Sequence, residues 1–252
     1  GYGLMGKQII SLFYLLGYTV NVWNHTPADL SLLSKIIEKN EPNFDRSIGE
    51  IILFENIESL PNSTTIEVLV EDLEIKKDIF IQLKKNVSKS LFTNSSSFTP
   101  SEIGHEVGLL HFFNPIRMKL VEYISVSQDA EEHQIIEDLR LNGFLIANVQ
   151  NNRCFLGNFL LFHEFSTVFK LIEKYNYSYK NIEDMVNKLY GQRDLLKIID
   201  IIGVDVVNRI MQNLKEIEED FYVSKFLIKA ERNAILGYKN NTSIKSFLNQ
   251  VC

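Results

Sequence analysis

The chain has 252 residues, 45% of them hydrophobic and 23% charged, which suffices for one large or two modest globular domains. Its formal net charge of −6 argues against nucleic acid or an anionic membrane surface as a partner, because both select basic surfaces. The most apolar run, residues 9–23, is interrupted by Gly17 and Asn21 and is too short to cross a bilayer. Cys154 and Cys252 are too few for a disulfide framework, and with no visible signal peptide we expect a cytoplasmic protein.

The sequence opens with GYGLMG, residues 1–6, which matches the dinucleotide-binding pattern G-x-G-x-x-G. A helical pattern follows and ends at Gly17, and residues 19–23 then have the pattern of a buried strand. Glycines of this kind let the backbone approach a pyrophosphate at the N-terminus of a helix. Since the motif normally follows a strand, we expect a strand upstream of it. The predicted cofactor contacts here are Gly1, Gly3, Leu4, Met5 and Gly6.

Strand and helix patterns alternate through the first 150 residues. Strands are predicted at 51–54, 66–70, 91–93 and 144–149, and helices at 30–39, 74–86 and 130–142. A chain that alternates in this way forms a parallel sheet with crossover helices. We therefore expect an α/β domain over residues 1–150.

Residues 108–122, GLLHFFNPIRMKLVE, combine a strand pattern, a sharp stop and a second apolar run. Proline after Asn114 ends the strand, because it has no N–H group to donate and restricts the residue before it. His111 is thereby expected near the carboxyl end of its strand, where open α/β sheets hold ligands. Glu122 could receive one imidazole nitrogen of His111 and leave the other to exchange a proton. Taken alone, this window favours a structural histidine over a catalytic one.

Helical periodicity dominates after Asn152, with no convincing strand. The predicted helices cover 154–175, 181–190, 193–200, 204–218 and 223–235. We place a domain boundary near residue 150, so that residues 151–252 form an all-α domain. Its apolar faces exceed what one small bundle hides, and we expect part of that surface to form a homodimer interface.

Together these segments resemble the 3-hydroxyacyl-CoA dehydrogenase family over nearly the whole chain. The resemblance is carried, in the family's order, by GYGLMG, EVLVEDLEIKKDIFIQL, FTNSSSFTPSEIG, GLLHFFNPIRMKLVEYI, FLGNFLLFHEF and DIIGVDVV. It implies an α/β Rossmann dinucleotide-binding domain followed by an all-α dimerisation domain. It also implies hydride transfer between NAD and the C3 hydroxyl or oxo group of a 3-hydroxyacyl thioester, with acyl-CoA as the substrate.

The resemblance implies catalytic roles for four matching residues. His111 is similar to the family's general acid/base, and Glu122 to the carboxylate that stabilises its imidazolium as it forms. Ser96 matches the serine that hydrogen-bonds the reacting oxygen, and Asn158 matches the asparagine that helps polarise the substrate carbonyl. On local pattern alone, Ser96 is more typical of a turn or helix cap, and Asn158 of a residue that satisfies neighbouring backbone.

Further matches imply contacts with the cofactor, at Glu71, Lys76 and Asn114. Without the resemblance, Lys76 is typical of a solvated helix face and Glu71 of a strand-end charge. Asn24 stands where the family usually has an aspartate that binds the adenosine ribose. NADP is therefore an alternative to NAD, because an amide does not repel a 2′-phosphate.

Other departures from the family leave the substrate open. Arg153-Cys154 replaces the usual Pro-Gly pair before the Asn158 helix, and the interval from His111 to Glu122 is one residue shorter. The family residues that grip the nucleotide end of coenzyme A have no match here. An acyl group bound to a carrier protein is thus one alternative, and a non-catalytic binding dimer is another. No metal site is predicted.

Overall fold

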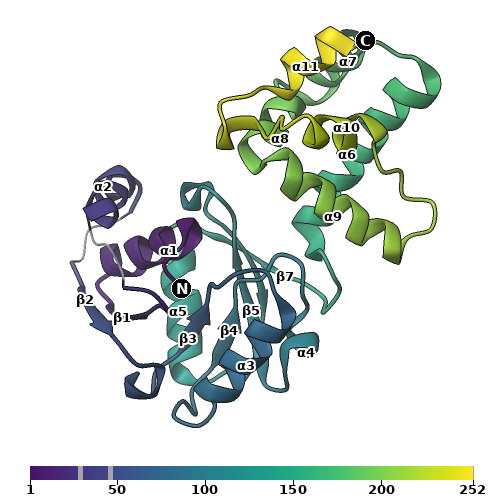
Figure 1. Ribbon diagram of the computed structural model, residues 1–252. Helices are drawn as coiled ribbons and strands as arrows, with labels where there is room; N and C mark the ends of the chain where they lie inside the picture. Colours follow the sequence, from purple (N-terminus) through teal and green to yellow (C-terminus); the bar gives the residue numbers. More distant parts are fainter. Residues whose placement is uncertain (28–30, 45–47, 252) are drawn as a thin grey trace. The chain divides into compact units, whose positions relative to one another are not determined.

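The structure, a computed structural model, describes residues 1–27, 31–44 and 48–251 (Figure 1). The chain divides into two compact units, Gly1–Leu156 and Gly157–Cys252. The predicted boundary near residue 150 lies in the segment between the last strand, β7 (Leu145–Asn148), and the long helix α6 (Phe155–Tyr175).

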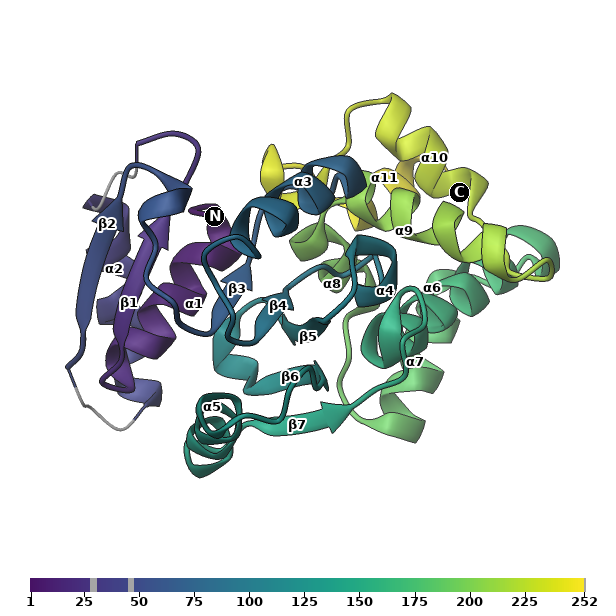
Figure 2. The ribbon, with the colours of Figure 1, turned by 90° about the horizontal axis from the view of Figure 1, so that it is seen from below.

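The first unit contains two β-sheets, one of two strands and one of five. In one, β1 (Thr19–Trp23) pairs in parallel with β2 (Glu50–Phe54). The other has the strand order β3-β4-β5-β6-β7, and Figure 2 shows the strands of both sheets following one another from β2 to β7. Its strands are β3 (Thr65–Glu67), β4 (Leu91–Thr93), β5 (Val107–Phe112), β6 (Leu120–Ile124) and β7.

Helices cover both faces of these strands (Figure 2). On one face, α1 (Leu4–Leu15) and α5 (Ala130–Leu141) pack into a core with Phe92, Leu110 and Phe112 of the sheet. On the other face, α3 (Leu73–Leu83) and α4 (Pro100–Ile103) contribute to a second apolar cluster. Every residue of β4 and β5 is buried, and these two central strands have nearly continuous apolar sequences, as strands covered on both faces do. The helix α2 (Ser31–Asn40) packs against α1.

One strand pair departs from the expected parallel arrangement. β3, β4 and β5 are parallel, but β6 runs antiparallel to β5. Only a short segment with one 3-10 turn (Ile116–Met118) separates these two strands, and a parallel crossover needs a dozen or more residues. The antiparallel register sets His111 directly opposite Glu122.

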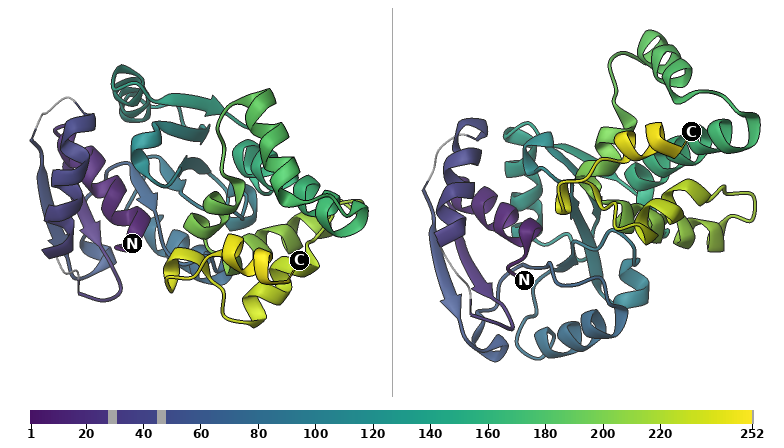
Figure 3. Two further views of the ribbon diagram at one scale, coloured as in Figure 1. Left: turned by 90° about the horizontal axis from the view of Figure 1, so that it is seen from above. Right: turned by 45° about the horizontal axis from the view of Figure 1, so that its top comes forward.

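The second unit is helical throughout its described residues (Figure 3). After α6 its helices are α7 (Tyr179–Tyr190), α8 (Leu195–Ile202), α9 (Val204–Ile217), α10 (Lys225–Arg232) and α11 (Ile244–Val251). Phe162, Phe165 and Phe169 on α6 are buried within it. Side chains that cap helix N-termini are numerous, and Ser178, Asp194 and Ser224 each accept from a backbone N–H of the first turn.

By length and composition α6 could cross a membrane, with a mean hydropathy of 1.2 over its most apolar window. A buried core helix passes the same test, and 44% of that window is buried inside the protein. His163 on α6 also pairs with Glu218, and Glu164 with Arg193. Polar side chains with partners along the helix and a half-buried window are typical of a core helix.

Most predicted elements agree with the structure to within a few residues. The strand predicted at 66–70 is shorter, since β3 ends at Glu67, and the helix predicted at 30–39 is observed from Ser31, with Leu30 outside the described residues. The helices α4 and α11 were not predicted. α4 is a single turn that a capping box holds, in which Thr99 and Glu102 bond each other's backbone N–H groups.

Candidate active site

A buried histidine and glutamate form the centre of the site. Nδ1 of His111 lies 2.8 Å from Oε2 of Glu122, and the side chains are 7% and 2% exposed. The strand pairing of β5 with β6 fixes this contact, because it places the two residues opposite each other. The ring centroid of Phe113 lies 4.7 Å from that of the His111 imidazole, and the ring centroid of Phe155 lies 6.1 Å from it. Among the described residues no hydrogen bond reaches Nε2, so this nitrogen is the one that can exchange a proton.

The loop after His111 is held by a glutamine that the sequence did not single out. Gln8, on α1, is buried and bridges two points of this loop. Its Nε2 donates to Oδ1 of Asn114 at 2.9 Å, and its Oε1 accepts from the N–H of Ile116 at 2.8 Å. The peptide bond between Asn114 and Pro115 is cis. The helix that follows the glycine turn is thus tied directly to the predicted ribose contact at Asn114.

The serine-rich turn after β4 is organised by Glu71. This carboxylate accepts from the backbone N–H of Ser96 at 2.7 Å and from its hydroxyl at 3.1 Å. It also accepts from the hydroxyl of Ser95, at 3.0 Å. Because β4 and β5 are parallel and in register, this turn and His111 lie at the same edge of the sheet. The hydroxyl predicted to meet the reacting oxygen is therefore pre-positioned by a carboxylate.

Lys76 is buried rather than solvated. Its side chain is 1% exposed, and Nζ lies 2.8 and 2.9 Å from the carboxylate oxygens of Glu67 and 3.3 Å from Glu71. Glu67 also accepts from the hydroxyl of Thr93 at 2.7 Å. A buried ammonium needs such partners, because an unpaired charge in the interior is costly. Of Lys76 and Glu71, which were both predicted to contact the cofactor, Glu71 is the one with accessible surface, at 22% exposed.

The glycine turn lies at the start of α1. Gly3 is the residue before the first helical turn, and a Cβ built on it would meet nothing within 4 Å. A Cβ on Gly6 would instead come 2.3 Å from the carbonyl oxygen of Gly1. Gly6 is thus required for the tight turn, and Gly3 leaves its backbone open to an approaching group. Leu4 and Met5 follow in the first turn, with Leu4 exposed.

Asn24, at the end of β1, is tied into the glycine turn. Its Oδ1 accepts from the N–H of Tyr2 at 3.0 Å, and its Nδ2 donates to the carbonyl oxygen and hydroxyl of Thr26, both at 3.0 Å. The amide acts as donor and acceptor at once, which an aspartate cannot do. This double role is a structural reason for asparagine at this position.

The other predicted catalytic residue, Asn158, lies in the first turn of α6 and belongs to the second unit. The preceding Arg153-Cys154 pair belongs to the first unit. Nε of Arg153 donates to Glu102 at 2.8 Å, which holds the pKa of that carboxyl below its usual value despite partial burial. Cys154 has the left-handed φ of 67° that glycine adopts more readily, and burial raises the pKa of its thiol to about 11.

No group of three or more histidine, cysteine, aspartate or glutamate side chains within the described parts of the chain is arranged to hold a metal ion. The ordered polar groups of the site are instead one imidazole, two carboxylates and a serine-rich turn at one edge of the sheet. Such an arrangement exchanges a proton at Nε2 of His111 and offers hydrogen bonds beside it.

Comparisons with known proteins identify the family of the chain. The family model for the 3-hydroxyacyl-CoA dehydrogenase NAD binding domain matches residues 1–140, more than half of the chain. A 3-hydroxybutyryl-CoA dehydrogenase of Clostridioides difficile is 27% identical over 239 residues, with 85% of each chain covered.

Solved structures share the fold. The crystal structure of M. tuberculosis FadB2 has a TM-score of 0.84 at 21% identity, and that of (S)-3-hydroxybutyryl-CoA dehydrogenase PaaH1 from Ralstonia eutropha has 0.82 at 19%. Each match covers 97% of this chain and 95% of the other. The expected order of a Rossmann domain and a helical region is confirmed. The chain belongs to the 3-hydroxyacyl-CoA dehydrogenase family of NAD-dependent oxidoreductases.

Proposed function

We propose that the chain oxidises the C3 hydroxyl of a 3-hydroxyacyl-CoA to the 3-oxo compound, or catalyses the reverse reduction, with His111 as the general acid/base. The observation that carries this proposal is the buried contact of 2.8 Å between Nδ1 of His111 and Glu122. It fixes the ring so that Nε2 takes the hydroxyl proton as the carbonyl forms. The Glu122 carboxylate then stabilises the imidazolium.

The residues of the glycine turn fit NAD. Gly3 leaves open space at the N-terminus of α1, whose first turn carries no acidic side chain that would repel a pyrophosphate. Gly1, Gly3 and Gly6 would hold the pyrophosphate through backbone N–H groups, and Asn114 and Glu71 would contact the nicotinamide half. Bound NAD would supply the hydride acceptor for C3.

Ser96 and Glu71 act together in this proposal. Glu71 holds the backbone and the hydroxyl of Ser96, so the position of that hydroxyl is set before substrate arrives. When substrate binds, the hydroxyl would turn its single hydrogen from Glu71 to the oxygen on C3, while the backbone N–H of Ser96 stays bonded to Glu71. Asn158 would assist at the thioester carbonyl. Preorganised donors of this kind stabilise developing charge at little reorganisation cost.

Purified protein mixed with NADH and acetoacetyl-CoA tests the proposal. We expect rapid loss of nicotinamide absorbance, and a loss of at least about 10²-fold in kcat for His111→Gln. If only an acetoacetyl group on an acyl carrier protein is reduced, the chemistry stands and coenzyme A is wrong. If NADH binds but no thioester is reduced, the protein is a binding member of the family and the proposed reaction is wrong.

We propose further that the second unit forms a homodimer. α7 is strongly amphipathic, yet Met185, Leu189 and Tyr190 on it are 63%, 65% and 75% exposed. Contiguous exposed apolar surface of this kind marks an interface. Light scattering of the intact chain should give twice the monomer mass, and Leu189→Lys should shift it toward the monomer mass, whereas Lys188→Glu on the neighbouring polar face should not.

A further inference from the structure

The segment that joins β7 to α6 is bound to the first unit through Arg153. Nε of Arg153 donates to Oε1 of Glu102 at 2.8 Å, and Nη2 donates to the same oxygen. The other oxygen of Glu102, Oε2, accepts from the N–H and the hydroxyl of Thr99, both at 2.9 Å. The carboxylate is thus held on α4 through one oxygen and binds the guanidinium through the other.

The backbone directly after Arg153 is strained. Cys154 and Phe155 have φ values of 67° and 44°, so two successive residues that are not glycine lie in the left-handed region. Such conformations cost free energy and persist only where surrounding contacts hold them. Both side chains are buried, and the N–H of Phe155 donates to the carbonyl of Asn152 at 3.3 Å. We call residues 154–155 the strained turn.

The strained turn places an aromatic ring beside the catalytic histidine. The ring centroids of Phe155 and His111 are 6.1 Å apart, and the rings are tilted by 38°. Phe155 is the first residue of α6, yet it belongs to the first unit, as Arg153 and His111 do. The hydrogen bond to Glu122 fixes Nδ1 but leaves the imidazole able to tilt about that bond, and packing of a neighbouring ring limits this motion.

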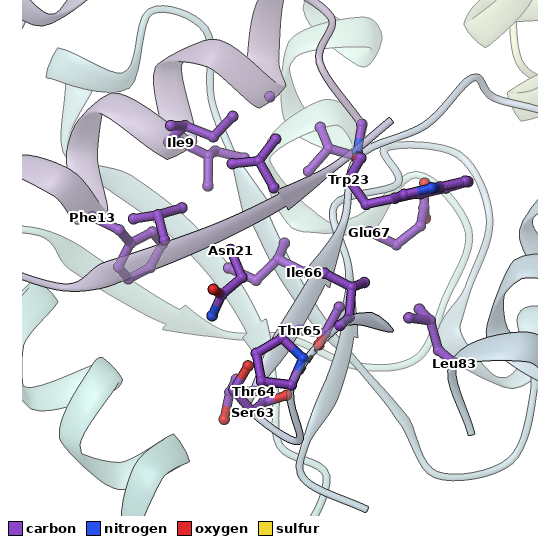
Figure 4. A pocket seen from close by; sticks show the side chains of 18 of the residues that line it. Ile9, Phe13, Asn21, Trp23, Ser63, Thr64, Thr65, Ile66, Glu67 and Leu83 are labelled. Atoms are coloured by element: carbon purple, nitrogen blue, oxygen red, sulfur yellow. Dashed lines mark hydrogen bonds between the residues drawn. The ribbon is translucent and has the colours of Figure 1, made fainter. Parts of the chain in front are cut away.

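The strained turn is separate from the cavity of about 180 Å³ along β1 and β3, which Figure 4 shows. Asn21 of β1 and Ile66 of β3 are among the residues that line that cavity, whereas Arg153 and Phe155 do not line it. Since only Cys154 separates Arg153 from Phe155, a displaced guanidinium would move the ring beside His111 directly.

We propose that Arg153 is a positioning residue for the active site. Its ion pair with Glu102 holds the strained turn closed, and the closed turn keeps the ring of Phe155 beside the imidazole of His111. The consequence for turnover rests on the proposed function, because it requires that His111 transfers the proton. The anchoring of the turn requires no reaction. Misplacement of a catalytic group by about 1 Å can lower a rate about 100-fold, so a loosened turn should lower kcat.

The thiol of Cys154 tests the anchoring without substrate. With Cys252→Ser in every protein, Cys154 is the one cysteine left in the sequence, and its reaction with a neutral maleimide can be followed. Burial should make this reaction slow in the parent protein. Arg153→Met should speed it about tenfold, because two charge-assisted hydrogen bonds at a partly exposed site are lost.

The direction of this change is diagnostic. Burial raises the pKa of the Cys154 thiol, and the charge of Arg153 lowers it. Loss of that charge alone would leave less thiolate and slow the reaction. A faster reaction in Arg153→Met therefore measures opening of the turn.

Two further variants show whether Glu102 is the anchor. Glu102→Gln keeps the helix cap, since glutamine serves at this position, but removes the charge. It should speed the maleimide reaction, and the double variant with Arg153→Met should react no faster than Arg153→Met alone. Arg153→Lys keeps the charge and should stay within about threefold of the parent protein.

The second readout is kcat for the reduction of acetoacetyl-CoA. Arg153→Met should lower kcat about tenfold with little change in the KM for NADH, and Arg153→Lys should recover most of the loss. Arg193 provides a matched control, because it pairs with Glu164 at 2.8 Å in the second unit. The side chains of that pair are 41% and 25% exposed, against 38% and 27% for Arg153 and Glu102. Arg193→Met should change kcat and the maleimide rate by less than about twofold.

An unchanged maleimide rate in Arg153→Met would overturn the proposal, as would a faster rate with unchanged kcat. Additive effects of Arg153→Met and Glu102→Gln would also overturn it. Should Arg153→Met fail to fold, Glu102→Gln and Arg153→Lys decide by the same two readouts. A parent protein that reduces no thioester would refute the proposed function, and the maleimide rates would then decide by themselves whether Arg153 holds the turn.

Discussion

The two units each contain a histidine 2.8 Å from a glutamate, yet the two pairs differ in what they leave available. His111 and Glu122 are buried on neighbouring strands, and among the residues that the structure describes only Nδ1 of the imidazole has a hydrogen-bond partner. His163 on α6 and Glu218, the residue after α9, are each 36% exposed. Both ring nitrogens of His163 are hydrogen-bonded, Nδ1 with the carbonyl of Phe159 at 2.7 Å and Nε2 with Glu218. The same pairing distance is therefore no sign of catalysis. What distinguishes the first pair is burial together with a ring nitrogen that remains able to exchange a proton.

The largest expected effect separates these two histidines. His111→Gln should lower kcat for acetoacetyl-CoA reduction by about 10²–10⁴-fold, the usual contribution of general acid–base catalysis. His163→Gln should leave kcat within about twofold, since that ring has no proton-transfer role. Steady-state kinetics of both variants, with NADH binding measured in parallel, decide the matter. A similar loss of kcat in the two variants would mean that neither burial nor an unbonded ring nitrogen distinguishes a catalytic histidine in this protein.

Replacing the carboxylates of the two pairs should likewise affect kcat in the first pair and not in the second. Glu122→Gln keeps the shape of the side chain but removes the charge that stabilises the imidazolium, and we expect kcat to fall about 10²-fold with little change in the KM for NADH. Glu218→Gln is the matched control and should leave kcat unchanged. A Glu122→Gln enzyme with full kcat would reduce Glu122 to a packing residue.

A third carboxylate, the buried Glu132, sharpens the comparison, because it accepts several hydrogen bonds but has no histidine partner. Glu132 accepts from the hydroxyls of Tyr123, Ser90 and Ser125 and from the N–H of Ser127. Although burial raises its pKa, these hydrogen bonds outweigh that effect and lower the pKa to about 2.

The stability that Glu132 contributes is therefore present above its unfolded pKa, near 4.5, and is lost as the pH falls toward 2. Glu132→Gln should reduce the free energy of unfolding at neutral pH by about 1–3 kcal/mol. The penalty should shrink in acid. Denaturant unfolding at neutral and acid pH measures it, and a penalty that is constant with pH would contradict the assignment.

Gln8 tests how far the loop around Asn114 depends on α1. Gln8→Glu keeps the acceptor for Ile116 but removes the donor to Asn114, whereas Gln8→Leu removes both. We expect the KM for NADH to rise about fivefold in the first and more in the second, consistent with roughly 1 kcal/mol per hydrogen bond. Lys7→Ala, on the same helix, is the control. An unchanged KM in Gln8→Leu would remove any role for the bridge.

The smallest effect concerns the choice between NAD and NADP. Asn24→Asp adds a negative charge at the end of β1, which should raise the preference for NADH over NADPH by about fivefold, because a surface charge pair is worth on the order of 1 kcal/mol. Calorimetric titration with each nucleotide gives the ratio. A ratio that does not change would place the adenosine ribose away from Asn24.

Local pattern was sufficient for most of the elements and for the contact between His111 and Glu122. The proline after Asn114 and the short interval to Glu122 already imply that the chain turns back, and an antiparallel return must bring Glu122 near His111. The glycine turn was equally local, since it needs only a few consecutive residues and the helix after them. Such features are readable because their partners lie close in sequence.

Contacts between distant segments could not be predicted in this way. Gln8 meets Asn114 across 106 residues, and nothing in the sequence around either residue marks the partner. Lys76 lies on a helix that looks solvated, yet Glu67 and Glu71 at the adjacent strand end draw its ammonium into the interior. The capping box of α4, in which Glu102 follows Thr99 by three residues, is a sequence signal for a helix start. It lies in a serine-rich segment that is more typical of a turn.

The most direct test of the central claim is a single-turnover experiment with NADH and saturating acetoacetyl-CoA, followed by rapid-mixing absorbance. The account predicts fast loss of NADH in the unaltered protein and in His163→Gln. In His111→Gln the loss should be at least about 10²-fold slower although NADH binds normally. Equal single-turnover rates in all three proteins would contradict the assignment of proton transfer to His111.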